Sequence, residues 1–231
     1  MNKKPHVFFD LDHTLWDFES NSKATLIQLF DELNLEQLGI LNAESFVSTY
    51  LEVNDHYWQL YRQNMVSKAT LREGRFTSTF EKLGIPAREM PANLPDLYVS
   101  ICPHKTILMP NALEILHYLS DKFPMHIVTN GFKESQLTKL KGSGIDHFFD
   151  QIIFSEEVKC HKPDKAIFDE ALRLSNADRA TSFFIGDHLE ADILGSRNAG
   201  LIPIYFNPES KAHQENLSFE IKDLIELKNI L

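Results

Sequence analysis

Residues 7–15 read Val-Phe-Phe-Asp-Leu-Asp-His-Thr-Leu, and this stretch decides the fold because an apolar run ends there in two aspartates. Val7–Phe9 predicts a short buried strand, since it is β-branched and aromatic, follows Pro5 and is too brief for a helix. If the extended geometry continues, Asp10 and Asp12 lie on one side of the chain. Two carboxylates so placed repel each other, which favours a nearby cation. A solvated turn explains them equally well from these residues alone.

The composition is that of an ordinary soluble chain, with 231 residues of which 43% are hydrophobic. This length fits one large domain or a core with a smaller inserted one. A net charge of -10 argues against nucleic acid or an anionic membrane as a partner, although it leaves room for a local basic pocket. We expect neither a signal peptide nor a transmembrane helix, since the first apolar run is short and no apolar span reaches transmembrane length. Cys102 and Cys160 form no metal-like pair, so we expect free thiols and a cytoplasmic enzyme.

The segment 16–103 predicts an all-helical unit. From Ser20 to Leu83 apolar residues recur at helical spacing, with a helix expected over Ser67–Leu83 and another over Leu94–Ile101. Proline and glycine residues stop these helices. The apolar stripes comprise Ala24, Ile27, Phe30 and Leu33, followed by Phe46, Tyr50, Val53, Tyr57, Leu60 and Tyr61.

After Pro110 the pattern changes to alternating strands and helices. Asn111 is expected to cap a helix whose fourth residue is Glu114. Such alternation predicts a parallel sheet covered by helices on both faces. The strands are expected at 125–129, 151–154, 182–186 and 202–206, and the later helices at 134–141, 163–174, 189–199 and 221–230.

Polar residues follow several of the predicted strands, where ligands bind in such sheets. Besides Asp10 and Asp12 these are Thr129-Asn130-Gly131, Gly186-Asp187 and Asp192, with His161-Lys162-Pro163-Asp164 between them. Each has a structural explanation: Thr129 as a helix cap, Lys162 as a surface lysine and Asp187 as an N-cap. Together they combine carboxylates, a hydroxyl, a lysine and glycine-flanked amides in the order of a phosphoryl-transfer site.

Four of these motifs resemble those of the haloacid dehalogenase-like hydrolase superfamily, over the whole chain. They are Asp-Leu-Asp-His-Thr at 10–14, Thr129-Asn130-Gly131, Lys162-Pro163 and Gly-Asp-His-Leu-Glu-Ala-Asp at 186–192. The resemblance implies a Rossmann-like, doubly wound parallel core in residues 1–15 and 104–231, with an all-helical cap, 16–103, inserted after the first motif. The phrases at 129–132, 155–158 and 192–195 resemble the pyrimidine 5'-nucleotidase branch, whose members hydrolyse nucleoside monophosphates, including noncanonical ones.

Hydrolysis of a phosphomonoester requires an in-line nucleophile, neutralisation of the phosphoryl charge and a proton for the alcohol. In this interpretation Asp10 attacks phosphorus and forms an aspartyl-phosphate. Mg²⁺ is expected to bridge its carboxylate and the substrate phosphate. The resemblance implies that the Asp12 backbone carbonyl and Asp187 also bind the metal. Asp192 is expected behind them, where it orients a metal-bound water or Lys162.

The remaining groups bind the phosphate or transfer protons. Thr129, Asn130 and Gly131 are expected to donate hydrogen bonds to phosphate oxygens, and Lys162 to balance their charge. Because only the Asp12 backbone is expected to bind the metal, its side chain is left for proton transfer. It is expected to protonate the leaving oxygen and then to activate water. Because a halide leaves without a proton, Asp12 favours a phosphatase over a 2-haloacid dehalogenase.

Two histidines stand beside the motif aspartates. For His13 and His188 a supporting or packing role is favoured over ligation, since an oxygen-rich site suits Mg²⁺. Substrate choice is expected to come from the helical cap, with Trp16 and Phe18 as substrate-binding residues because they follow the catalytic loop directly. Further stacking surfaces and cations of this segment are Tyr57, Trp58, Tyr61, Arg72 and Arg75.

The sequence thus predicts a Mg²⁺-dependent phosphomonoester hydrolase that acts on a small phosphorylated metabolite, with pyrimidine nucleoside 5'-monophosphates favoured. Phosphoglycolate or a sugar phosphate is an alternative substrate. A non-catalytic protein that retained the fold is an alternative of another class. A monomer or a homodimer is expected.

Overall fold

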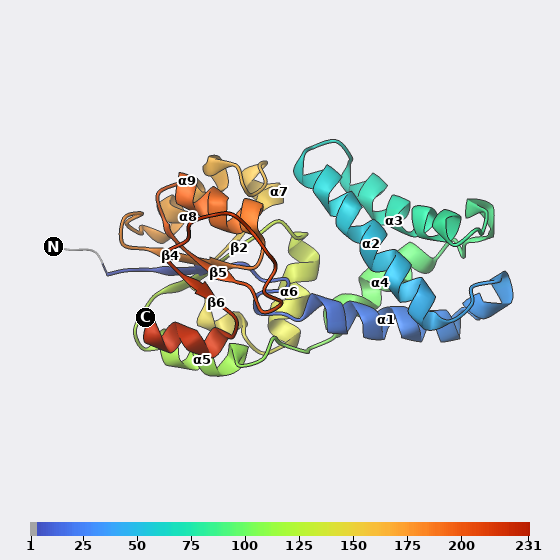
Figure 1. Cartoon of the computed structure of the whole chain (residues 1–231), viewed down its shortest axis with the longest axis horizontal. Helices are drawn as coiled ribbons and strands as arrows, with labels where there is room; N and C mark the ends of the chain where they lie inside the picture. Colours follow the sequence, from blue (N-terminus) through green and yellow to red (C-terminus); the bar gives the residue numbers. More distant parts are fainter. Residues whose placement is uncertain (1–3) are drawn as a thin grey trace. The chain divides into compact units, whose positions relative to one another are not determined.

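The computed structural model describes residues 4–231, so residues 1–3 of the predicted core lie outside it. The chain divides into two compact units (Figure 1). One unit runs to Phe18 and resumes over Thr106–Leu231, and the other is Glu19–Lys105. Among the described residues, no helix has both the length and the apolar character needed to cross a membrane.

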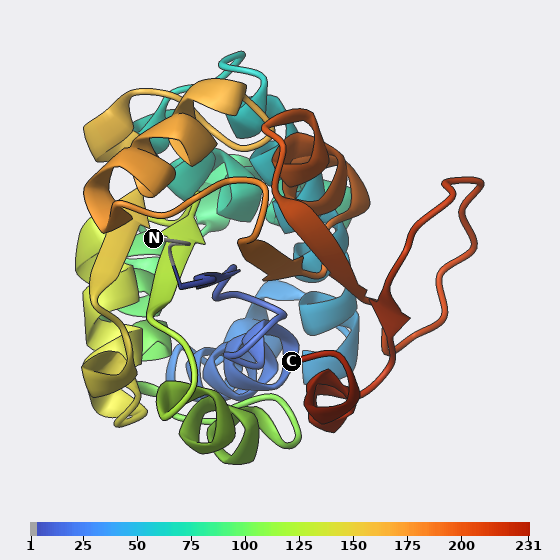
Figure 2. The ribbon, with the colours of Figure 1, turned by 90° about the vertical axis from the view of Figure 1, so that its left-hand side faces the viewer.

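The first unit is built on a six-stranded sheet in the order β3-β2-β1-β4-β5-β6. Every neighbouring pair of strands is parallel, and Phe9 of β1 is level with Ile127 of β2 and with Ile185 of β4. β1 therefore lies inside the sheet, flanked by β2 and β4 (Figure 2). The strands are β1 (Val7–Phe9), β2 (Met125–Thr129), β3 (Gln151–Phe154), β4 (Phe183–Gly186), β5 (Ile202–Phe206) and β6 (Glu220–Ile221).

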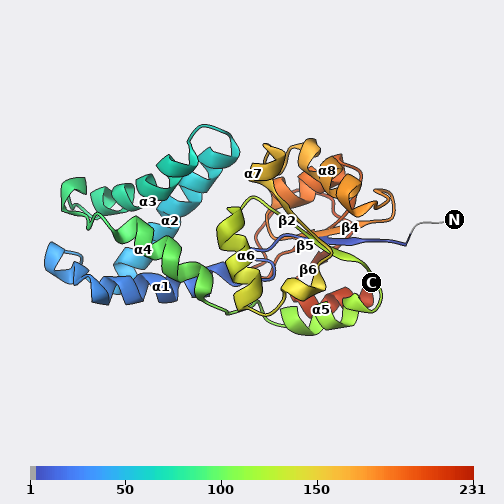
Figure 3. The same ribbon diagram turned by 180° about the vertical axis from the view of Figure 1, so that it is seen from behind.

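Helices cover both faces of this sheet, which confirms the predicted doubly wound α/β class (Figure 3). On one face, Phe168 of α8 (Lys165–Ser175) packs in a buried cluster with Phe8 of β1 and Phe184 of β4. On the other face lies α5 (Ala112–Ser120), beside the C-terminal 3₁₀ helix. The remaining helices of this unit are α6 (Lys133–Gly142), α7 (Ser155–Val158) and α9 (Gly195–Asn198).

The C-terminal segment differs from the predicted helix 221–230. Glu220–Ile221 instead forms β6, which pairs with the end of β5, and a 3₁₀ helix covers Leu224–Asn229. A capping box between Asp223 and Glu226 begins that helix. The buried residues Ile221, Leu224 and Leu227 recur every three positions, which matches three residues per 3₁₀ turn better than an α-helix.

Two further predicted elements need correction. Asn111 does not cap α5 with its side chain: its φ is 62°, and its Nδ2 donates to the Asp223 carboxylate at 2.8 and 2.9 Å. The predicted helix 189–199 is a π-helix over Leu189–Leu194 followed by the short α9. The Asn111 contact joins residues 112 positions apart, so local sequence does not reveal it.

The second unit is helical, as its apolar spacing predicts. α2 and α3 pack against each other, and Asn42 and Ser67 cap them. Arg75 of α3 is buried there, donates to Asn54 Oδ1 at 3.0 Å and lies 4.9 Å from the Tyr98 ring centroid. The helices are α1 (Phe18–Glu32), α2 (Ala43–Arg62), α3 (Lys68–Lys82) and α4 (Leu94–Ile101).

Candidate active site

The ends of β1 and β4 bring three carboxylates together. The Asp10 N–H donates to the Ile185 carbonyl at 2.9 Å, so Asp10 continues the ladder between the two strands. One carboxylate oxygen each of Asp10, Asp187 and Asp192 lies within 4.8 Å of the others. Asp10 and Asp192 are buried and Asp187 is half-buried. Because hard divalent cations prefer oxygen ligands, these carboxylates can hold such an ion.

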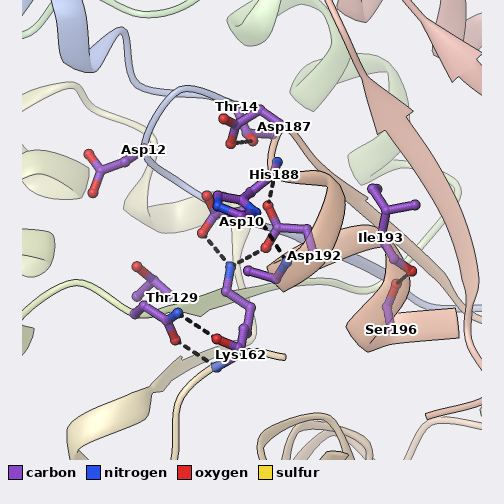
Figure 4. A network of polar contacts seen from close by, with 12 residues as sticks. Asp10, Asp12, Thr14, Thr129, Lys162, Asp187, His188, Asp192, Ile193 and Ser196 are labelled. Carbon is purple, nitrogen blue, oxygen red and sulfur yellow. Dashed lines mark hydrogen bonds and ion pairs between the residues drawn. The ribbon is translucent and has the colours of Figure 1, made fainter. Parts of the chain in front are cut away.

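Lys162 is the cation that faces these carboxylates. Its Nζ lies 2.6 Å from Asp10 Oδ1 and 2.7 Å from Asp192 Oδ1, and its side chain is 3% exposed (Figure 4). The Asn130 side chain holds the Lys162 backbone from both sides: its Nδ2 donates to the carbonyl at 3.1 Å, and its Oδ1 accepts from the N–H at 2.9 Å. The loop after β2 therefore places the lysine.

One lysine among three carboxylates leaves an excess of negative charge. Burial raises the pKa of Asp10 to about 8; Lys162 opposes this rise, and the carboxylates of Asp192 and Asp187 add to it. Burial and Asp192 likewise raise the pKa of Asp187 to about 7. Although burial acts against it, the pKa of Lys162 is raised by Asp10 and Asp192. A bound cation would therefore favour the ionised form of the cluster.

Neighbouring groups orient the acids that follow β4. Thr14 Oγ1 donates to Asp187 Oδ1 at 3.2 Å. The His188 N–H donates to Asp192 Oδ2 at 3.0 Å, and its Nδ1 accepts from the Ala191 N–H at 3.1 Å. A Cβ on Gly186 would lie 2.5 Å from the Asp192 carboxyl group, so only glycine allows this approach.

The two motif histidines play different parts. His188 caps the π-helix and holds Asp192, while the His13 ring packs 4.9 Å from the Phe18 ring. Within residues 4–231, neither belongs to the carboxylate group that can hold a metal. Supporting and packing contacts are therefore what the structure shows for them.

Asp12 is separate from the carboxylate cluster. In Figure 4 its carboxylate points away from that of Asp10. Lys139 Nζ lies 2.6 Å from Asp12 Oδ1, and Gln136 Nε2 donates to Asp12 Oδ2 at 2.8 Å. Burial alone would raise the pKa of Asp12, but the charge of Lys139 and these hydrogen bonds lower it below its usual value. Both oxygens of the Asp12 carboxylate thus have partners on α6, and its role in proton transfer stays a prediction.

Gln136 also reaches the phosphate-binding motif. Its Nε2 donates to Thr129 Oγ1 at 2.8 Å, and the Gly131 N–H donates to the same oxygen at 3.0 Å. A Cβ on Gly131 would lie 1.8 Å from Gln136 Nε2, so the glycine makes room for the amide. Sequence reasoning missed Gln136 and Lys139. Their signal is spacing: polar residues at i and i+3 occupy the inward face of a helix with few apolar residues.

Trp16 and Phe18, the two residues after the catalytic loop that are predicted to contact substrate, differ in exposure. Trp16 is fully buried, and Lys139 Nζ lies 4.4 Å from its ring centroid. It therefore belongs to the packing beneath Lys139 and offers no open stacking face here. Phe18 is half-buried, with Lys139 Nζ at 5.8 Å from its ring. Arg72 forms a 2.7 Å ion pair with Asp96.

The chain is similar to known proteins over most of its length. The family model for haloacid dehalogenase-like hydrolases matches residues 7–205. The pyrimidine 5'-nucleotidase YjjG of Escherichia coli (strain K12) is 32% identical, covering 97% of this chain and 96% of its own. The pyrimidine 5'-nucleotidase PynA of Streptococcus pneumoniae is 30% identical, covering 91% of this chain and 85% of its own.

A solved structure has a similar fold over nearly the full length of both chains. The HAD-hydrolase YfnB of Bacillus subtilis, bound to magnesium, superimposes with a TM-score of 0.88 at 28% identity, covering 99% of both chains. The family match spans the first strand, the four motifs and β5. The chain is therefore an enzyme of the haloacid dehalogenase-like hydrolase family.

Proposed function

We propose that this hydrolase is a Mg²⁺-dependent phosphatase that works through an aspartyl-phosphate on Asp10 and prefers pyrimidine nucleoside 5'-monophosphates. The observation that carries the proposal is the buried cluster of Asp10, Asp187 and Asp192 with Lys162 as its cation. Such a cluster needs a further positive charge, and a phosphomonoester dianion brings none. The names of YjjG and PynA support the nucleotide class.

The metal would be held by the carboxylates of Asp10 and Asp187 and by the Asp12 backbone carbonyl. When bound, Mg²⁺ supplies positive charge between the nucleophile and the phosphate. Asp192 already accepts from the His188 N–H and pairs with Lys162, which supports an orienting role. The YfnB structure, which contains magnesium, supports the choice of ion.

The chain's own residues then carry out two displacements. A carboxylate oxygen of Asp10 attacks phosphorus as the ester P–O bond breaks. Asp12, which must first take up a proton although Lys139 lowers its pKa, gives that proton to the leaving oxygen. Water next attacks the phosphorus of the aspartyl-phosphate and passes a proton to Asp12, which releases inorganic phosphate and regenerates Asp10. Thr129 and Lys162 bind the equatorial oxygens. Because the carboxylates of Asp10 and Asp12 point apart, separate roles suit them.

The helical unit Glu19–Lys105 is proposed as the cap that selects the substrate, with Phe18 at its entry. Arg72 and Arg75 are engaged inside that unit, so neither is needed for substrate contact in this proposal. The two described cysteines, Cys102 and Cys160, are not joined in a disulfide, which supports a reducing cytoplasm as the location. A monomer or a homodimer acting on small metabolites is proposed.

A phosphomonoester panel tests the function. UMP, dUMP and dTMP are compared with purine nucleotides, sugar phosphates and phosphoglycolate, each with Mg²⁺ and with a chelator, and a 2-haloacid is included. Phosphate release from the pyrimidine nucleotides, lost with the chelator and in Asp10→Asn, supports the proposal. Faster turnover of phosphoglycolate or a sugar phosphate would reassign the substrate. Halide release would indicate a dehalogenase, and inertness towards every compound a binding protein.

A further inference from the structure

Helix α6 directs two polar side chains at Asp12. Gln136 and Lys139 are three positions apart in the sequence, so they lie on the same face of the helix. The first is fully buried, and the side chain of the second is 8% exposed. Each binds a different oxygen of the Asp12 carboxylate, at 2.8 and 2.6 Å. The carboxylate is thereby held at both oxygens.

One polar atom of Gln136 makes no hydrogen bond with the described residues. Its Nε2 donates to both Asp12 Oδ2 and Thr129 Oγ1, but its Oε1 is buried without a hydrogen-bond partner among the described residues. A buried acceptor left unpaired is unfavourable, and an apolar side chain of similar length would avoid it. Packing alone therefore does not account for an amide here. What the amide adds is a link between Asp12 and Thr129.

That link also sets the direction of the Thr129 hydroxyl. Thr129 Oγ1 accepts from Gln136 Nε2 at 2.8 Å and from the Gly131 N–H at 3.0 Å. A hydroxyl has two acceptor lone pairs and one proton. With both lone pairs engaged, the proton remains for donation to another group. A phosphate oxygen, which only accepts, is the partner that this hydroxyl suits.

Lys139 is restrained from its other side. Its Nζ lies 4.4 Å from the Trp16 ring centroid and 5.8 Å from that of Phe18. A long lysine side chain normally samples many rotamers, but burial against these rings limits them. The ammonium group is therefore fixed beside Asp12 Oδ1.

We propose that Gln136 and Lys139 are positioning residues for phosphoryl transfer: together they fix the Asp12 carboxylate, and Gln136 also turns the Thr129 hydroxyl towards the phosphate. This inference rests on the proposed function, because it concerns the proton donor of that reaction. Neither residue touches the reacting atoms; each acts through Asp12 or Thr129.

The test compares two leaving groups, one that needs a proton and one that does not. A defect in proton transfer slows only the first, whereas a general loss of activity slows both. The variants are Gln136→Met and Lys139→Met, with Lys139→Arg as the conservative change and the exposed Lys141→Met, on the same helix, as the control. Each is assayed in the pre-steady state, with substrate in excess over enzyme, using the best nucleotide of the panel and p-nitrophenyl phosphate. The nucleotide ester needs a proton to leave, whereas p-nitrophenolate does not.

We expect both Met variants to slow phosphorylation by the nucleotide at least about 10-fold and to change phosphorylation by p-nitrophenyl phosphate little. Hydrolysis of the aspartyl-phosphate still needs Asp12, so p-nitrophenol should appear in a burst of about one per active site. Lys139→Arg should lose less than Lys139→Met, and Lys141→Met should match the wild type. Thermal unfolding of each variant confirms that it is folded.

Equal slowing of both substrates without a burst, or wild-type rates in the folded Met variants, would overturn the positioning role while the proposed function stands. A wild-type enzyme that hydrolyses no phosphomonoester would overturn the proposed function, and this inference with it. The wild-type arm therefore distinguishes the two failures.

Discussion

Lys162 Nζ lies 2.6 Å from Asp10 Oδ1, although 152 residues separate the two in the chain. Both side chains are buried, so the ion pair fixes the orientation of the carboxylate that follows β1. A solvated aspartate would sample several rotamers, and attack would require one of them. The contact therefore presents one carboxylate oxygen in a defined place, which is what a nucleophile needs.

Replacing this carboxylate should abolish turnover. Asp10→Asn keeps the size of the side chain but removes the negative charge that attacks phosphorus, so we expect a loss of at least about 1,000-fold in kcat. Steady-state phosphate release measures it, with the exposed Asp31→Asn as the control. Substantial hydrolysis by pure Asp10→Asn protein would reject Asp10 as the nucleophile.

Mg²⁺ should bind more tightly as the pH rises. In the metal-free protein the pKa of Asp10 is about 8 and that of Asp187 about 7, so at pH 6 both carboxyls hold protons that a cation must displace. The apparent affinity should therefore increase between about pH 6 and pH 8, with proton release on binding.

Isothermal titration in two buffers of different ionisation enthalpy measures the released protons. Asp187→Asn, which removes one of the titrating groups, should bind Mg²⁺ more weakly and with a flatter pH dependence. An affinity that is the same at pH 6 and pH 8 would contradict the prediction.

Acid should destabilise the fold through His126. Burial and the neighbouring His6 lower the pKa of His126 to about 3, whereas an unfolded histidine titrates near 6.5. Between these values the unfolded chain binds a proton that the folded chain does not, so stability falls as the pH drops from about 6.5 towards 3. The loss approaches about 1.4 kcal/mol for each pH unit.

Urea unfolding at pH 7 and pH 5 measures this contribution. The free energy of unfolding should fall less in His126→Phe than in the wild type, because phenylalanine does not titrate. The exposed His104→Gln should behave like the wild type. Identical pH dependence in wild type and His126→Phe would refute the assignment.

Gly131 should tolerate no side chain. In Gly131→Ala the new Cβ meets Gln136 Nε2 at 1.8 Å, so the amide must leave Asp12 and Thr129. We expect kcat/KM to fall about 10- to 100-fold. Gly142→Ala, at the end of the same helix, is the matched control because its Cβ would meet only Thr106 Cγ2 at 3.8 Å. Equal activity in the two variants would show that Gln136 can move without consequence.

Most of the fold could be predicted because its signals are local. Short apolar runs bounded by turn residues place strands at Met125–Thr129, Gln151–Phe154 and Ile202–Phe206, with the bounds that the structure shows. Pro103, two residues after α4, likewise marks the end of Leu94–Ile101. The predicted helix over the C-terminal segment was wrong because Glu220–Ile221 takes its conformation from the edge of β5, a partner remote in sequence.

Which residues stand at the strand ends follows from the order of apolar and polar residues along the chain. Asp10, Thr129 and Asp187 each follow or close an apolar run, and parallel strands bring their carboxyl ends to one edge. The groups that surround these residues are set by how the helices pack on the sheet. The face that α6 turns towards the sheet depends on packing, so the sequence could not reveal that Gln136 and Lys139 hold Asp12. These contacts, which form only in the folded chain, give the Asp12 carboxylate its orientation.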